Sequence, residues 1–385
     1  MIDVFQVADL LVSHAVRTYG EEIDIIGYYG SYAQGMASDH SDLDIFYIPA
    51  DGKNPPVNRP VLVDGILFDF WPITWETMEV FATGHARGWA YAPALVYYAK
   101  VLYSRSDASV VRLADLKQQV VDLQQPEARP QMVRRAQDRF QDVYAHIGKL
   151  RLAVASDSVT DVRHVGWQLI GSVLECLALM NQVFFDRGGD HIMEQLSRLQ
   201  VQPEDLAHLI TIISTAADSN AIAEAAEALA RGTRHLLSQC QPADSAQSAA
   251  SNQFHNAYPE INDQIRKVVS ACQQQHGVAA SFEAWCVQHE VSLMMAEAVG
   301  TAGFHPGVNF ISEYLAPYRS IGLPDLIGDS FSDMHTVADH AALFDSRLRR
   351  WLCEQSVGLD EYSSVDEFAQ SLSRPRQERG TTRPV

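Results

Sequence analysis

The chain has 385 residues, of which 47% are hydrophobic, and its formal net charge is −19. This length provides two or three domains with buried cores, so the five scattered cysteines are not needed as a disulfide framework. The acidic balance disfavours extended nucleic acid as a partner unless another surface compensates, and it favours metal ions and positively charged small molecules.

We expect the N-terminal residues to form a helix and not a targeting signal. Asp3, Asp9 and His14 interrupt its apolar pattern, which is typical of an amphipathic helix and not of a signal peptide. No uncharged run approaches the roughly eighteen residues that a membrane span needs. The cysteines form no C-x-x-C pair and no zinc-ligand spacing. We therefore expect a cytoplasmic protein in a reducing compartment, with no membrane partner.

Strand patterns occupy the N-terminal part of the chain. The predicted elements there are a helix over 2–19, a strand over 23–29, a glycine-bounded turn over 30–35, a strand over 43–48 and a hairpin over 61–73. The hairpin is indicated by Asp64-Gly65, a strong two-residue turn signal between two apolar runs.

The remainder of the sequence has helical periodicity. Helices are predicted near 75–83, 91–103, 109–123, 130–153, 161–185, 191–199, 203–216 and 219–239. We therefore predict an α+β chain with a sheet-containing domain over 1–105, a helical bundle over 106–240, a linker over 241–257, an accessory helical region over 258–372 and a disordered tail over 373–385.

Two aspartates stand at the head of a predicted strand, although aspartate is depleted in strands and costly to bury unpaired. Asp42 and Asp44 project from the same face because side chains at i and i+2 of a strand share a face. Asp69 would join them if its strand pairs with 43–48. Three close carboxylates need a counter-charge, and Mg²⁺, as one ion or as a two-metal site, supplies it.

A glycine-rich loop precedes these aspartates. Seven of its residues fit the spacing G-S-x-x-x-G-x-A-x-x-x-S-D-x-D, namely Gly30, Ser31, Gly35, Ala37, Ser41, Asp42 and Asp44. This stretch resembles the signature of the DNA polymerase β-like nucleotidyltransferase superfamily, and Asp69 resembles its third carboxylate. The alternative interpretation is that these are ordinary turn residues, or that the domain has lost its activity.

The resemblance implies a small mixed-sheet nucleotidyltransferase domain with Asp42, Asp44 and Asp69 as catalytic metal ligands. Gly30, Ser31 and Ser41 would contact the nucleotide, with ATP as the expected substrate. Followed by a helical bundle, this domain is similar to the aminoglycoside nucleotidyltransferases of the kanamycin type, which are dimers. The resemblance thus implies an antibiotic-resistance enzyme that moves AMP to a hydroxyl of a small cationic acceptor and releases pyrophosphate.

The helical part offers further candidates for the site. Glu175 shares a helix face with Gln168, Gly171 and Ser172 and would serve as general base, although a solvated surface glutamate explains it as well. Alternative bases are Glu76 and Glu79. Contacts to the triphosphate are expected from Arg139 and Lys149, on the same helix as Arg134 and Arg135, although exposed basic residues are usually just solvated.

Two other classes of function fit the same residues. The acceptor could be a protein or a tRNA end, as in the adenylylating regulators and antitoxins of this superfamily. The domain could instead be a non-catalytic nucleotide-binding module with a regulatory role. The three filled carboxylate positions favour an enzyme, whereas the loss of any one of them would favour a binding module.

Overall fold

A computed structural model describes residues 3–38, 41–84, 88–187, 191–240, 254, 257–299, 305, 307–328, 331, 333–359, 362 and 364–372. The chain divides into two compact units, Met1–Ala243 and Asp244–Val385. Apart from Phe254 and Ala257, the predicted linker over 241–257 lies outside the described residues, as does the predicted tail over 373–385. Within the described residues no helix is both long enough and apolar enough to cross a membrane.

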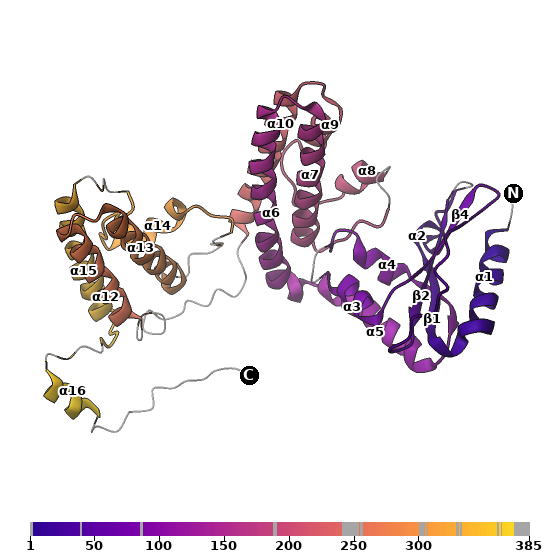
Figure 1. Cartoon of the computed structure of the whole chain (residues 1–385), viewed down its shortest axis with the longest axis horizontal. Helices are drawn as coiled ribbons and strands as arrows, with labels where there is room; N and C mark the ends of the chain where they lie inside the picture. The colour runs from indigo at the N-terminus through magenta and orange to yellow at the C-terminus, as the bar shows by residue number, and fades with distance from the viewer. Residues whose placement is uncertain are drawn as a thin grey trace. The chain divides into compact units, whose positions relative to one another are not determined.

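A five-stranded sheet forms the centre of the N-terminal part (Figure 1). Its strands are β1 (Ile23–Tyr29), β2 (Leu43–Pro49), β3 (Val61–Val63), β4 (Ile66–Pro72) and β5 (Lys100–Ser104), in the order β3-β4-β2-β1-β5. β2 and β4 pair in parallel, and the other neighbours are antiparallel, which makes the sheet mixed. The α+β class and the hairpin over 61–73 are confirmed.

Helices cover both faces of this sheet. α1 (Val4–Tyr19) packs Val4, Ala8 and Ala15 onto one face, in a core shared with β1, β2 and β4. The opposite face is covered by α3 (Trp75–Thr83), α4 (Ala92–Tyr98) and α5 (Asp107–Leu123). Phe46 of β2 is fully buried in this second core. The strand that carries Asp44 is therefore fixed by packing on both sides.

Long helices follow within the same unit. They are α6 (Arg129–Ala155), α7 (Val159–Asn181), α9 (Leu206–Thr215) and α10 (Ser219–Gln239), with the short α8 (Ile192–Leu196) before α9. α6 and α7 lie side by side, and α10 packs against both of them (Figure 1). The buried side of α7 is almost continuously apolar, so this helix forms the centre of the bundle.

Three predicted elements differ from the structure. Residues Gly30–Gln34 form a short helix, α2, instead of a simple turn. The helix predicted over 91–103 is wrong in its second half, because Lys100–Ser104 pairs with β1 as an edge strand. The helix predicted over 161–185 ends at Asn181, since Gln182 adopts a left-handed conformation with φ 54°.

The C-terminal unit is helical. Its helices are α12 (Tyr258–Gln273), α13 (Gly277–Val299), α14 (Ile311–Ser320), α15 (Met334–Glu354) and α16 (Val365–Leu372). The first four of these share one apolar core that includes Tyr258, Tyr318 and Phe344. The C-terminal unit therefore has an apolar core of its own.

Candidate active site

The strand register places two of the predicted carboxylates beside each other. Asp44 of β2 lies opposite Asp69 of β4 in the parallel pair and opposite Tyr29 of β1 in the antiparallel pair. Neighbouring strands are about 4.8 Å apart, so these three side chains share one neighbourhood. Asp42 is exposed and precedes Asp44 by two residues, at the entrance to β2. The pairing expected between 43–48 and the Asp69 strand is thus present.

The carboxylates of Asp42, Asp44 and Asp69 are close enough to affect one another's ionisation. Burial raises the pKa of Asp44 to about 6, and the carboxylates of Asp42 and Asp69 add to that rise. Burial also raises the pKa of the Tyr29 hydroxyl, followed by the effect of Asp44. A cation would lower the free energy of this group of side chains most directly.

The donor set fits Mg²⁺. Within the described part of the chain, no group of three or more His, Cys, Asp or Glu side chains is placed to hold a metal ion by itself. Mg²⁺ rarely uses such an all-protein cage and is usually bound by one or two carboxylates together with phosphates and water. Asp44 and Asp69, with Asp42 at the strand entrance, match that mode of binding.

Gly30 brings the loop backbone against Asp44. Its φ is +75°, and a Cβ atom at this position would come within 2.6 Å of the Asp44 Oδ2 atom. Only glycine allows both this conformation and this approach. Ser31 follows in α2, whose C-terminal cap is Gly35 with φ +73°. Ser41 uses its hydroxyl locally, since Oγ accepts a hydrogen bond from the Ser38 backbone N–H at 2.8 Å.

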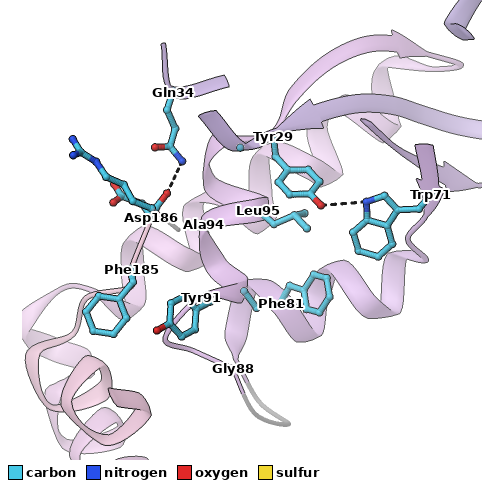
Figure 2. A pocket seen from close by; sticks show the side chains of 13 residues that line it. Tyr29, Gln34, Trp71, Phe81, Gly88, Tyr91, Ala94, Leu95, Phe185 and Asp186 are labelled. Carbon is cyan, nitrogen blue, oxygen red and sulfur yellow. Dashed lines mark hydrogen bonds between the residues drawn. The ribbon is translucent and has the colours of Figure 1, made fainter. Parts of the chain in front are cut away.

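A cavity of about 470 Å³, here called the aromatic cavity, opens beside Gly30 (Figure 2). Its wall includes Tyr29, Trp71, Phe81, Tyr91 and Phe185. The Trp71 indole N–H donates to the Tyr29 hydroxyl at 3.2 Å, as the dashed line in Figure 2 shows. The cavity therefore has an apolar wall. It extends to Gly30, whose backbone lies against the Asp44 carboxylate.

Gln34 links α2 to the segment after α7 at the edge of the aromatic cavity. Its side-chain amide donates to the Asp186 backbone carbonyl at 2.8 Å (Figure 2). The Asp186 carboxylate in turn accepts a hydrogen bond from the Tyr98 hydroxyl at 2.9 Å. Both contacts hold this segment beside the five-stranded sheet.

A second cavity of about 370 Å³, here called the polar cavity, shares Gly88 and Tyr91 with the first. It is lined by polar side chains of α6 and α7, which include Arg139, Asp142, His146, Gln168, Ser172 and Glu175. The structure thus brings the predicted residues Arg139 and Glu175 together. Lys149 is exposed and lines neither of these two cavities, because it lies ten residues beyond Arg139, about 15 Å along the helix.

Glu175 is half-buried, and its carboxylate has hydrogen-bond partners within the protein. Its carboxylate accepts hydrogen bonds from the backbone N–H groups of Gly88, Trp89 and Ala90 at 3.2, 2.8 and 2.8 Å. We call these three residues, 88–90, the strap. Charged acceptors form stronger hydrogen bonds with amides than neutral ones do. The carboxylate therefore anchors the wall between the two cavities, and its role as general base stays a prediction.

Further contacts hold the strap against the helical bundle. The Trp89 indole N–H donates to the Val183 carbonyl at 2.8 Å, and the Phe185 N–H donates to the Ala90 carbonyl at 2.7 Å. Arg135 donates to the Gly84 carbonyl at 2.6 Å and lies over the Trp89 ring. Arg135 therefore stabilises the position of the strap against α6.

We expect Glu175→Gln to lower the free energy of unfolding by about 1–3 kcal/mol, because one of the two acceptor oxygens is lost. If the carboxylate mainly positions the strap, KM should rise more than kcat falls. A general base predicts instead a drop in kcat of about 10²–10⁴. Urea unfolding and steady-state kinetics separate the two, with Glu224→Gln on the exposed side of α10 as the control.

The alternative bases lie elsewhere. Glu76 and Glu79 line a separate cavity with Arg112, and the Glu79 carboxylate pairs with that guanidinium at 2.8 Å.

The sequence did not predict several residues of the two cavity walls, mainly Tyr91, Phe185 and Asp186. Their signal was the density of aromatic residues in 89–98 and 184–185, which periodicity alone assigns to helix packing.

Comparison with known proteins bears on the helical part. Residues 111–242 match the family model of the KNTase C-terminal domain. No curated protein matches the chain. A nucleotidyltransferase-like protein from Exiguobacterium sibiricum 255-15 is 14% identical, with 58% of this chain and 74% of that chain covered at a TM-score of 0.36. With the motif over 30–44 ahead of it, the KNTase C-terminal match confirms the chain's resemblance to the DNA polymerase β-like nucleotidyltransferase superfamily.

Proposed function

We propose that this chain transfers a nucleoside monophosphate from a nucleoside triphosphate, with ATP expected, to a hydroxyl of a small molecule and releases pyrophosphate. The observation that carries the proposal is the register of Asp44 and Asp69, with Gly30 against Asp44 and a cavity beside them. The match to a KNTase C-terminal domain supports the same class of reaction. An aminoglycoside is the acceptor that this likeness favours.

Different residues have different roles in the proposed reaction. Mg²⁺ bound by Asp44 and Asp69, with Asp42 at the strand entrance, would neutralise triphosphate charge and lower the pKa of the acceptor hydroxyl. Gly30 lets the backbone approach a phosphate, and the Ser31 hydroxyl and N–H are suited to its oxygens. The strap and the aromatic wall exclude water and hold the reactants in line, which supplies much of the rate enhancement.

Arg139 and Glu175 act from the helical bundle in this proposal. The Arg139 guanidinium supplies positive charge to the triphosphate from the polar cavity. Glu175 holds the strap and is the candidate base for the acceptor hydroxyl. A homodimer in the cytoplasm, as the family resemblance implies, remains part of the proposal.

The test is Mg²⁺-dependent pyrophosphate release from ATP, GTP, CTP and UTP with a panel of hydroxyl compounds. The double variant Asp42→Asn/Asp44→Asn should abolish release, whereas Asp9→Asn on the exposed side of α1 should not change it. Release that survives the double variant would contradict the assigned chemistry. Binding of nucleotide without any turnover would favour a macromolecular acceptor or a binding module.

A further inference from the structure

Arg187 is the one basic side chain among the described residues that line the aromatic cavity. The same cavity extends to Gly30, where the loop backbone would approach a phosphate. Arg139 lines the polar cavity, whose wall does not include Gly30. A triphosphate that contacts the loop at Gly30 therefore shares its cavity with Arg187.

Side chains from two helices fix the backbone of Asp186 and Arg187. The Gln195 side chain of α8 is buried, and its Oε1 atom accepts hydrogen bonds from the N–H groups of Asp186 and Arg187 at 2.8 and 3.2 Å. Its Nε2 atom donates to the Arg187 carbonyl at 3.2 Å. Gln34 of α2, the helix that begins at Gly30, donates to the Asp186 carbonyl at 2.8 Å (Figure 2). These bonds fix the position from which the Arg187 side chain extends.

The fold uses only part of the hydrogen-bonding capacity of Arg187. Its Nη1 atom donates to the Glu194 carboxylate at 3.0 Å, and Arg198 donates to the same carboxylate. The Glu194 side chain is 47% exposed, and ion pairs at the surface contribute little to stability. The Arg187 Nε–H is buried and has no acceptor in the part of the chain that the structure describes. The guanidinium can therefore exchange Glu194 for a stronger acceptor at little cost.

Phosphate oxygens are such acceptors. The N–H groups of a guanidinium match two phosphate oxygens at once, and these charge-assisted bonds are stronger than bonds between neutral groups. The Tyr29 hydroxyl on the same wall accepts from Trp71, which leaves its own proton to donate to a ligand. Two side chains of this wall thus offer donors to an oxygen-rich ligand.

We propose that Arg187 binds the two terminal phosphates of the nucleoside triphosphate in the aromatic cavity. This inference rests on the proposed function and adds a second cation to Arg139. In the transfer step the acceptor oxygen bonds to the α-phosphorus, and the hydroxyl proton passes to a base. The bond from the α-phosphorus to the bridging oxygen breaks, and its electron pair leaves with pyrophosphate. Arg187 stabilises the negative charge that develops on this leaving group.

Binding of α,β-methylene ATP to the full chain with Mg²⁺ tests the proposal without turnover. We expect Arg187→Gln to raise Kd at least tenfold, and Arg187→Lys to raise it less because the charge is kept. AMP lacks both terminal phosphates, so its binding should not differ between the wild type and Arg187→Gln. The matched control is Arg198→Gln, since Arg198 shares the Glu194 carboxylate but lines neither cavity, and this variant should bind as the wild type does.

The outcomes separate this inference from the proposed function. Equal Kd values for the wild type and Arg187→Gln would overturn the inference, as would an equal loss of AMP binding, which indicates a structural role. Pyrophosphate release that Arg187→Gln leaves unchanged, in KM for ATP and in kcat, would also overturn it while the proposed function stands. Weaker analogue binding by Arg187→Gln, in a protein that transfers to no hydroxyl compound, would support the phosphate site and contradict the proposed function. A wild type that binds no nucleotide would overturn both.

Discussion

Replacement of Asp44 by Asn should reduce nucleotidyl transfer at least a thousandfold and, at neutral pH without metal, make the protein more stable. Activity falls because the half-buried carboxylate of Asp44 can no longer hold a cation against the triphosphate. Stability rises because the amide has no charge to keep apart from Asp42 and Asp69.

The pH dependence follows from the direction of the shift. The pKa of Asp44 is raised from 3.8 to about 6, so the folded protein binds this proton more tightly than the unfolded chain does. Its contribution to stability is fully present below about pH 4 and is lost as the pH rises through about 6. Above that pH the ionised carboxylate costs on the order of 2–3 kcal/mol, which the Asn variant avoids.

Urea unfolding of both proteins at pH 4 and pH 7.5 measures this effect. The advantage of Asp44→Asn should be present at pH 7.5 and absent at pH 4, and added Mg²⁺ should stabilise only the wild type. The Asp9→Asn protein should follow the wild type throughout. An Asp44→Asn protein less stable than the wild type at pH 7.5 would show that the carboxylate is already balanced by neighbouring groups.

Gly30→Ala should reduce kcat about a hundredfold, whereas Gly35→Ala should keep most of the activity. Both glycines have a positive φ, near +75° and +73°, so either substitution costs about 1–2 kcal/mol in backbone strain. They differ in what the new Cβ atom meets, since Gly35 has no neighbouring atom within 4 Å and Gly30 faces the Asp44 carboxylate. That carboxylate must turn away, and such displacements at a reacting centre are costly.

Comparing the two variants separates the effect of the Cβ contact with Asp44 from the backbone strain that both substitutions introduce. Melting temperatures should fall by similar amounts, while kcat for pyrophosphate release at saturating ATP should separate them. If both variants lose activity equally, the loop geometry matters as a whole and the contact with Asp44 has no special role.

The strands that carry Asp44 and Asp69 could be predicted because their signals are local. Asp64-Gly65 fixes the hairpin, and the spacing from Gly30 to Asp44 reports a loop and a strand entrance in one short segment. The edge strand β5 could not be found in this way. Its residues, Lys100–Ser104, continue an apolar pattern that also fits a helix, and the free edge of β1 decides between the two.

The role of Glu175 was beyond a sequence argument for a different reason. Its three donors are backbone groups of residues 88–90, more than eighty positions away, and a backbone N–H leaves no mark in the sequence. The polar face of α7 was visible as a pattern of residues, but the partner of that face was not. Tertiary hydrogen bonds of this kind appear only when the chain is folded.

The strap also determines how this protein can be divided. A fragment that ends near residue 105 would retain the sheet, yet the amides of Trp89 and Ala90 would lose their acceptor on α7, and Trp89 would lose its cover. Each buried amide left without a partner costs about 1–3 kcal/mol, which is a large share of the stability of a small domain. Chimaeras that exchange the sheet domain should therefore carry their own residues 88–90 together with the helix that holds them.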